Sequence, residues 1–292
     1  MKQLSGKELY EKETKLAEYS GDDRIVSSHE LAKELEKTQD SEFIVRTGVP
    51  SLDRLMDGGV EAGELIVVTG PTGEGKTTFL MTVTKNMAEN EVASVWFTLE
   101  VTPRQFIKKI TKKGQLPLFY LPLENTDNQI QWLEDRIVEA KVKHNVRVVF
   151  IDHLHQIFSM AKMDRTHNVS LEIGDLTAKI KNMALQHNLA IFLIAHTKDD
   201  PTGSSREPRK EDIRDSGLIS RLADSIIGLW RVTNDEKIDA TKRKVIGEDD
   251  DKAKVRIFKN RRNGRLGAWF MHHRDHYLTE LETGMDLWDQ QS

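Results

Sequence analysis

Residues 65–78 read Leu-Ile-Val-Val-Thr-Gly-Pro-Thr-Gly-Glu-Gly-Lys-Thr-Thr. The stretch opens with a continuous apolar run, Leu65–Thr69, of the kind that forms a buried parallel strand. The next eight residues, Gly70–Thr77, match the pattern G-x-x-x-x-G-K-[ST], Thr78 follows them, and a helical pattern, Thr77–Met87, overlaps their end. Strand, glycine-rich loop and helix in this order predict a phosphate-binding P-loop. Its residues are Gly70, Pro71, Thr72, Gly73, Glu74, Gly75, Lys76, Thr77 and Thr78.

The P-loop chemistry assigns separate roles to the last residues of the motif. Lys76 is expected to reach the β- and γ-phosphates, and the Thr77 hydroxyl is expected to bind Mg²⁺. The glycines allow the backbone to approach an anion closely. Pattern and context agree, so a chance match is disfavoured. We therefore expect Mg²⁺ as cofactor and ATP, or another NTP or dNTP, as substrate.

Apolar runs recur along the chain and alternate with helical patterns. Further strands are predicted at Val92–Thr98, Val146–Ile151, Leu189–Ala195, Ser225–Trp230 and Lys254–Phe258, and further helices at Gln129–Lys143 and Leu171–His187. Strands that alternate with helices form a mainly parallel twisted sheet with helices on both faces. The fold class is therefore α/β. Thr197–Arg214 and Thr233–Lys252 are polar and are predicted to be loops.

A magnesium-binding carboxylate is expected at the end of another strand. Residues 148–152 supply four apolar side chains followed by Asp152. An apolar run followed by Asp is common by itself. Its position 75 residues after Thr77 favours a Walker B role, in which the carboxylate holds Mg²⁺.

Two further polar residues follow predicted strands. Glu100 could orient or deprotonate the attacking water, because parallel strands present their carboxyl ends to one crevice. The alternative is an acid near a helix N-terminus, stabilised by the helix dipole. His196 could donate a hydrogen bond to a γ-phosphate, or it could be a structural histidine. The residues alone leave both choices open.

The bulk composition is that of a soluble protein. The chain has 292 residues, 38% hydrophobic and 31% charged, with no cysteine and a formal net charge of −4. The missing cysteines exclude disulfides and thiolate chemistry. No apolar run is long enough to cross a bilayer, so we expect no membrane association. The acidic balance disfavours a surface coated for duplex DNA, although the basic clusters Arg206–Lys210 and Arg256–Arg265 remain either charged faces or binding sites.

The first 40 residues differ from the rest. They are strongly charged and carry helical periodicity, with Ser28 predicted as an N-cap and Glu30 in the first turn. We predict two parts, a helical N-terminal arm or linker at 1–40 and an α/β domain at 41–292. The composition fits a disordered tail and a docking arm equally well.

Six segments in order, over roughly residues 44–280, resemble the RecA-like motor domain of the DnaB-type (superfamily 4) hexameric replicative helicases. The similarity is nearest to the phage primase–helicase and Twinkle branch. The segments are RTGVPSLDRLMDGGVEAGELIVVTGPTGEGKTT (46–78), WFTLEVTPRQ (96–105), VVFIDHLHQI (148–157), LAIFLIAHTK (189–198), EDIRDSGLISRLADSIIGLWR (211–231) and KNRRNGRLG (259–267).

The resemblance implies roles for individual residues. Glu100 matches the catalytic glutamate and His196 the γ-phosphate sensor. Arg261 matches an arginine finger that acts on the nucleotide of the adjacent subunit, with Arg262 as the second candidate. The resemblance also assigns two residues to the nucleotide, a neighbouring lysine, Lys259, and a residue near the base, Arg231.

The resemblance makes the segment 197–214 a DNA-facing loop of a central channel. Its basic residues would contact the phosphates of single-stranded DNA without regard to sequence, which a cationic pore allows despite a negative net charge. They are Lys198, Arg206, Arg209 and Lys210. The resemblance further implies a ring, normally a hexamer, in which residues ~25–37 dock on the next subunit. It implies a separate primase, loader or polymerase, and a location in the cytoplasm or in a viral replication complex.

Two other functions use related sequences. A RecA- or RadA-type recombinase would carry an N-terminal polymerisation motif, which we do not find. A KaiC-like ATPase would act on a protein, and single-stranded DNA would not stimulate its hydrolysis. The segments KNRRNG and DIRDSG favour the helicase.

Overall fold

The computed structural model describes residues 5–21, 24–37, 43–111, 116–124, 130–153, 169–197, 216–232, 252–274 and 277–281. Its contacts divide the chain into two units, Met1–Ser41 and Glu42–Ser292. We describe each unit by itself.

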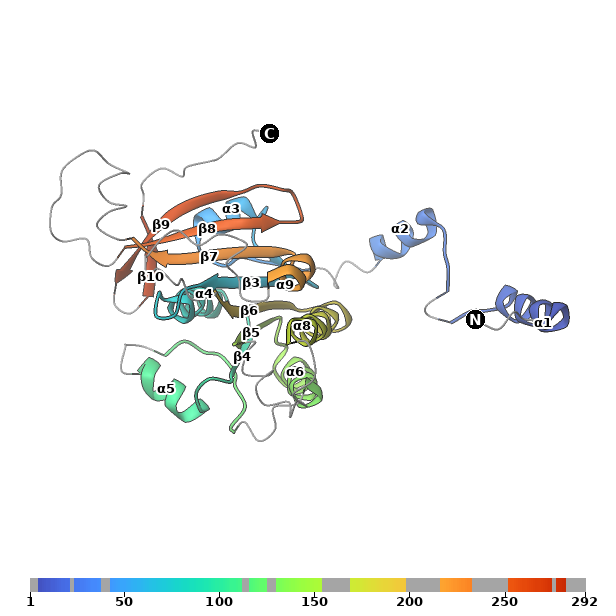
Figure 1. Ribbon diagram of the computed structural model, residues 1–292, viewed down its shortest axis with the longest axis horizontal. Helices are drawn as coiled ribbons and strands as arrows, with labels where there is room; N and C mark the ends of the chain where they lie inside the picture. Colours follow the sequence, from blue (N-terminus) through green and yellow to red (C-terminus); the bar gives the residue numbers. More distant parts are fainter. Residues whose placement is uncertain are drawn as a thin grey trace. The chain divides into compact units, whose positions relative to one another are not determined.

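The larger unit is built on an eight-stranded sheet with the strand order β10-β9-β8-β7-β3-β6-β5-β4 (Figure 1). Five adjacent strands are parallel: β7 (Ser225–Arg231), β3 (Leu65–Gly70), β6 (Ala190–His196), β5 (Val148–Asp152) and β4 (Ser94–Thr98). Three antiparallel strands extend the sheet beyond β7: β8 (Lys252–Asn260), β9 (Gly267–Arg274) and β10 (Tyr277–Glu280). The predicted α/β class with a mainly parallel sheet is confirmed.

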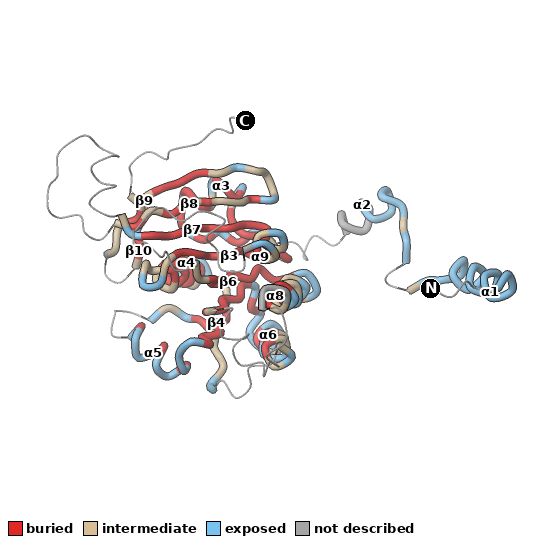
Figure 2. The backbone as a smooth tube through the Cα atoms, viewed as in Figure 1, coloured by how far each residue is buried: buried red, intermediate tan, exposed pale blue. Residues whose placement is uncertain are grey.

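Helices cover both faces of this sheet because alternate residues of each parallel strand point to opposite sides. In β3, Ile66 and Val68 belong to the hydrophobic core that includes α3 (Pro50–Leu55), α4 (Lys76–Glu89) and α5 (Pro103–Thr111). Leu65 and Val67 belong to a second core, which includes residues of α6 (Ile130–His144), α8 (Val169–Gln186) and α9 (Ser216–Leu222). Burial on both faces explains why these strands are continuous apolar runs (Figure 2).

All six predicted strands are present, with ends shifted by one or two residues or, in β8, extended. The helices α3, α5 and α9 and the strands β9 and β10 were not predicted. Strand β8 shows why the antiparallel part is hard to recognise, since its residues alternate between buried and half-buried positions. Such strands lack the long apolar run on which the sequence prediction relies.

A small two-stranded sheet precedes the main one. Strand β1 (Ile44–Val45) pairs with β2 (Val60–Glu61), and α3 lies between them in the chain. The Asp53 carboxylate of α3 accepts hydrogen bonds from the backbone N–H groups of Thr47 and Gly48, at 2.8 and 3.1 Å. These bonds fix the turn between β1 and α3.

The smaller unit contains α1 (Gly6–Ala17) and α2 (Ser28–Lys37). A capping box formed by Ser5 and Glu8 starts α1. The Oγ of Ser27 accepts the hydrogen bond from the Glu30 N–H at 3.1 Å, so Ser27 caps α2 and the prediction of Ser28 was wrong by one residue. Ser27 takes this role because its side chain lies three residues before a free N–H of the first turn.

Among the residues that the structure describes, no helix combines the length and apolar character needed to cross a membrane.

Candidate active site

The register of the parallel strands brings four predicted site residues to one edge of the sheet. Gly70 at the end of β3 pairs with His196 at the end of β6, and Thr98 at the end of β4 pairs with Asp152 at the end of β5. Glu100 follows two residues after Thr98. The carboxyl ends of parallel strands form the usual ligand crevice of such sheets.

The P-loop conformation depends on glycine at its ends. Gly70 has φ +151°, and a Cβ at this position would lie 2.0 Å from the carbonyl oxygen of Leu229 in β7. Gly75 has φ +104° and is the N-cap of α4, with no side-chain hydrogen bond to the first helical N–H groups. The loop therefore brings backbone N–H groups to a helix N-terminus, an arrangement that fits a polyphosphate.

Lys76 is 5% exposed, and its Nζ donates hydrogen bonds to the carbonyl oxygens of Gly70 at 2.8 Å and Pro71 at 2.7 Å. Burial lowers the pKa of Lys76 to about 8, although the carboxylates of Asp152, Glu74 and Glu100 act in the opposite direction. A bound phosphate would add further negative charge beside this buried ammonium group and favour its charged form.

Thr77 and Asp152 form a pair suited to Mg²⁺. The Thr77 hydroxyl donates to Oδ2 of Asp152 at 2.8 Å. Burial raises the pKa of the Asp152 carboxyl, while the Thr77 hydrogen bond opposes this shift. A hydroxyl and a carboxylate at this separation, beside a phosphate loop, are the oxygen ligands that Mg²⁺ requires.

Glu100 is exposed and lies beside the same carboxylate-bearing strand. Its backbone N–H donates to the Asp152 carbonyl oxygen at 3.3 Å, and its side chain is 57% exposed. The helix that follows, α5, is capped by Thr102 and Gln105, whose side chains accept each other's backbone N–H at 3.3 and 3.1 Å. Glu100 is therefore not needed to cap α5 and lies at the edge of the site.

His196 lies against the P-loop, with its Nδ1 3.5 Å from the Thr72 hydroxyl. Its ring also meets the ring of His153 edge to face, with 4.3 Å between centroids. Nδ1 of His153 in turn lies 3.5 Å from Oε2 of Glu100. Sequence reasoning missed His153, although its position directly after Asp152 was a signal.

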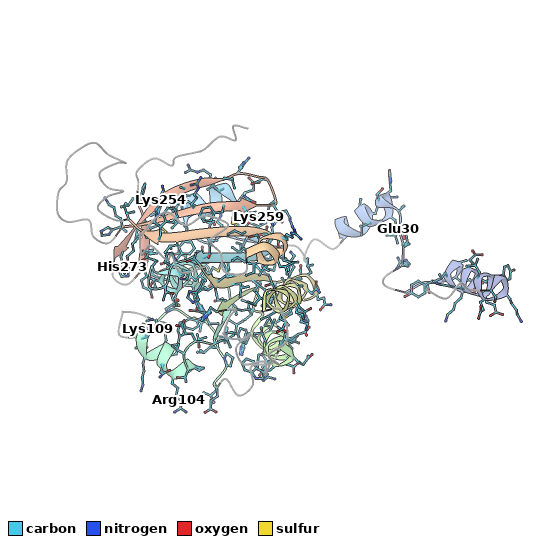
Figure 3. The ribbon with its side chains drawn as sticks, in the orientation of Figure 1. Glu30, Arg104, Lys109, Lys254, Lys259 and His273 are labelled. Atoms are coloured by element: carbon cyan, nitrogen blue, oxygen red, sulfur yellow. The ribbon has the colours of Figure 1, made fainter. Side chains whose placement is uncertain are left out.

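Arg231 lies at the same edge, at the end of β7. Its backbone N–H donates to the Glu74 carboxylate of the P-loop at 2.5 Å. A pocket beside the loop is lined by Thr77, Thr78, Met81, Phe106, Lys109, Ile110 and Tyr277. Of these, Lys109 on α5 is labelled in Figure 3.

Lys259 and Arg261 lie at the other end of the strands, opposite the P-loop. Strand β8 runs antiparallel to β7, so Asn260 at its end pairs with Ser225 at the start of β7. The ammonium group of Lys259, a residue labelled in Figure 3, lies at this end of the strands. It donates to the carbonyl oxygens of Ser220 and Ala223 at the end of α9. Arg261 donates to the carbonyl oxygen of Arg221 at 2.7 Å.

Arg261 and Arg262 have different environments. The Arg261 side chain is 54% exposed and lies 3.4 Å from the Asp224 carboxylate. The Arg262 side chain is 16% exposed, pairs with Glu64 at 2.6 Å and Glu61 at 3.1 Å, and donates to the carbonyl oxygen of Gly59. Of these two arginines, only Arg261 has the exposure to reach beyond its own chain. The predicted DNA contacts Lys198, Arg206, Arg209 and Lys210 lie outside the described residues.

The sheet order, the P-loop and the Thr77–Asp152 pair define the class of protein, a P-loop NTPase with a RecA-like fold. The model of the "DnaB-like helicase C terminal domain" family matches residues 115–280, and that of the "KaiC" ATPases matches residues 45–116. The first match covers more than half of the chain, and the chain belongs to the DnaB-like helicase C-terminal domain family.

Individual relatives are distant. The replicative DNA helicase DnaB of Rickettsia typhi is 24% identical over 67% of this chain and 46% of its own length. That of Mycoplasma pneumoniae is 24% identical over 76% of this chain and 53% of its own length. The chain spans about half the length of these curated relatives.

Two solved structures share the fold. A DnaB-like replicative helicase, described with its interactions with primase, has a TM-score of 0.66 at 19% identity, covering 94% of this chain and 71% of that one. A KaiC-like protein from the hyperthermophilic archaeon Pyrococcus horikoshii has a TM-score of 0.56 at 19% identity, covering 82% and 99%.

Proposed function

We propose that this chain hydrolyses ATP or a related nucleotide with Mg²⁺ and uses the energy to translocate on single-stranded DNA and unwind duplex DNA. One observation carries the proposal beyond nucleotide binding, namely that Arg261 and the P-loop lie at opposite ends of the same strands. Asp224, whose carbonyl oxygen accepts the Arg261 N–H, lies beside the start of β3, and Gly70 ends that strand. The separation along β3 is about 17 Å for five residues.

An arginine at that distance cannot stabilise the γ-phosphate bound by its own chain. It can serve only a nucleotide held by a neighbour, so the site is completed in an assembly of subunits. Such a trans-acting guanidinium neutralises charge on the transferring phosphoryl group. We propose Arg261 for this role and exclude Arg262, whose guanidinium is engaged by Glu64 and Glu61. Membership of the DnaB-like family supports a ring, which we propose is a hexamer.

Within one chain, we propose a role in hydrolysis for each of the residues at the carboxyl ends of the parallel strands. The P-loop N–H groups and Lys76 bind the phosphates, while Thr77 and Asp152 hold Mg²⁺, which neutralises charge on the nucleotide. Glu100 accepts the proton of the attacking water, an assignment supported by its exposure beside Asp152. His196, in contact with Thr72, senses the γ-phosphate. Arg231 and the pocket near Tyr277 are proposed to accommodate the rest of the nucleotide.

Lys259 lies near Arg261 and not at the P-loop end of the strands. Its ammonium group is bonded to the end of α9, at the same edge as Arg261. We propose that it contacts a neighbour's nucleotide only in concert with Arg261. The segment before α9 carries Lys198, Arg206, Arg209 and Lys210, which we propose as the contacts to single-stranded DNA. A separate primase, loader or polymerase is the proposed further partner.

The match of residues 45–116 to the KaiC ATPases supports a second candidate, an ATPase that acts on a protein partner. The two functions differ in their response to DNA. The test is steady-state nucleotide hydrolysis with and without single-stranded DNA, with the native mass measured in parallel. Strong stimulation together with a mass near six subunits supports the ring helicase. If single-stranded DNA does not stimulate hydrolysis and the chain stays monomeric, the ring helicase is contradicted and the second candidate is favoured.

A further inference from the structure

Three metal-ligating side chains converge at the carboxyl edge of the sheet, beside the proposed Mg²⁺ pair. Glu100, His153 and His196 each offer one ligand atom, and these atoms all lie within 4.8 Å of one another. The carboxylate of Glu100 is 3.5 Å from Nδ1 of His153, and the two imidazole rings meet at 4.3 Å between centroids. Glu100 follows β4 by two residues, His153 directly follows β5 and His196 ends β6, and these three strands are adjacent in the sheet.

The chemistry of this cluster differs from that of the Mg²⁺ pair. Thr77 and Asp152 offer only oxygen, which suits Mg²⁺. Two imidazole nitrogens and one carboxylate are the ligands that Zn²⁺ and similar transition-metal ions prefer, and three protein ligands leave a fourth position open. We propose that Glu100, His153 and His196 form a binding site for a transition-metal dication of the Zn²⁺ type, distinct from the Mg²⁺ site.

The geometry is close to what such an ion requires. Tetrahedral coordination with bonds of about 2.1 Å separates ligand atoms by about 3.4 Å. The Glu100–His153 pair already has this spacing. Glu100 is 57% exposed, so its side chain can turn toward His196 without disturbing the core, while the His153 side chain is only 11% exposed. The site thus combines one nearly buried ligand with one exposed, adjustable ligand.

Metal binding here would inhibit the enzyme, a consequence that rests on the proposed function. An ion on Glu100 occupies the lone pairs with which the carboxylate would accept a proton from water. The same ion on His196 removes the nitrogen that would meet the γ-phosphate. The residues that bind phosphate and Mg²⁺ are left intact, so inhibition should reduce hydrolysis while nucleotide binding persists.

The first experiment measures binding alone, without nucleotide and with Mg²⁺ in large excess. Zn²⁺ is titrated into the full chain against a zinc-binding dye, and Co²⁺ absorption reports the coordination geometry. We expect one ion per chain at this site, with the affinity reduced on the order of tenfold or more in His153→Ala and in Glu100→Gln, because even outer-shell partners of metal sites contribute about that much. Glu100 is exposed, so Glu100→Gln keeps the test valid if His153→Ala fails to fold.

The matched control is His187→Ala, which removes a histidine of a different His–Glu pair, 3.0 Å from Glu134. This variant should bind Zn²⁺ as the unaltered chain does. Equal affinity in all four proteins would overturn the site.

The second experiment measures the ratio of hydrolysis with and without Zn²⁺ in each protein that hydrolyses nucleotide. We expect the half-inhibiting Zn²⁺ concentration to rise about tenfold or more in His153→Ala and to stay unchanged in His187→Ala. Binding without inhibition would overturn the inhibitory consequence. A chain that hydrolyses nothing even without Zn²⁺ would contradict the proposed function, while the dye titration would still decide the metal site.

Discussion

Arg262 and Glu64 form a nearly buried ion pair, with Nη2 and Oε2 2.6 Å apart and side chains 16% and 10% exposed. They are 198 residues apart in the sequence, and the pair joins the turn after β8 to the segment before β3. The neighbouring Arg261 points to a different partner, Asp224, and is 54% exposed. Two adjacent arginines thus have different environments: Arg262 is a structural partner of Glu64, whereas Arg261 is the exposed residue that we propose for a trans-acting role.

Replacing these arginines separately should have different effects on stability. Arg262→Ala leaves Glu64 buried without its partner and should lower the free energy of unfolding by about 3 kcal/mol. Arg261→Ala should change stability by about 1 kcal/mol or less, because Lys181 still neutralises Asp224 at 2.6 Å. Denaturant unfolding of both variants measures the difference. A larger loss from Arg261→Ala than from Arg262→Ala would contradict these roles.

The proposed trans role of Arg261 predicts complementation between inactive subunits. Arg261→Ala should bind nucleotide almost normally and lose hydrolysis by a factor on the order of 10³ or more, as does Glu100→Ala for a different reason. In mixed assemblies, a Glu100→Ala subunit supplies its intact Arg261 to the active site of an Arg261→Ala neighbour, which retains Glu100. Hydrolysis by mixtures should therefore exceed that of either variant alone. Mixtures that stay as inactive as the separate variants, although they co-assemble, would mean that the site is completed within one chain.

The buried ammonium group of Lys76 predicts proton uptake on nucleotide binding. Its pKa is lowered to about 8 in the free chain, and a bound phosphate favours the charged form and raises it again. Between the two pKa values, binding must therefore take up a proton, so affinity falls as pH rises above 8. Titration calorimetry at pH 9 in buffers of different ionisation enthalpy should detect uptake approaching about one proton per site.

The control for this proton is Lys76→Arg, whose guanidinium stays charged at every accessible pH. Binding by this variant, even if weaker, should show no uptake from this position. At a pH of about 6.5, where Lys76 is already protonated in the free chain, uptake from Lys76 should vanish in the unaltered protein as well. Uptake that persists in Lys76→Arg would assign the proton to another group.

Asp224 contacts groups from three different segments at the end of the strands where Arg261 lies. Its Oδ2 accepts from the Leu65 N–H at 2.8 Å and from Lys181 at 2.6 Å, and its Oδ1 faces Arg261. Asp224→Asn keeps the shape but removes the charge, leaving the part-buried Lys181 without a counter-ion. We expect a loss of about 3 kcal/mol in the free energy of unfolding. The double variant Asp224→Asn/Lys181→Met should recover part of it, and no recovery would contradict the pairing.

The N-terminal unit predicts a separable role in assembly. Its helices and the segment between them expose apolar side chains, with Ile25 fully exposed and Leu31 48% exposed. Deleting residues 1–41 should leave the unfolding midpoint of the larger unit unchanged, since contacts divide the chain at this position. The same deletion should lower the number of subunits per assembly, as calculated from the native mass measured with nucleotide present. A deletion that unfolds the larger unit would show that the two parts are one folding unit.

Much of the candidate site was predictable from the sequence. The P-loop and the Walker B aspartate are local patterns, in which a buried strand leads directly to the residue that uses it. Strand register then explains why Gly70, Asp152, Glu100 and His196 meet, because parallel strands with aligned ends bring their last residues to one edge. Helices α3, α5 and α9 and strands β9 and β10 were missed, since short or half-buried elements leave weak periodicity.

The sequence by itself determined the class of fold and the phosphate-binding chemistry of this protein, because apolar runs and glycine conformations act over a few residues. Only the tertiary structure decided that Arg262 is a structural partner of Glu64, that Arg261 lies at the edge opposite the P-loop, and that His153 joins Glu100 and His196. Each of these depends on groups up to 198 residues apart, and no local pattern encodes which distant charge a side chain will meet. The direction of the strands accounts for the position of Arg261, since β8 returns antiparallel to β7. Its last residues therefore lie at the end of the strands opposite the P-loop.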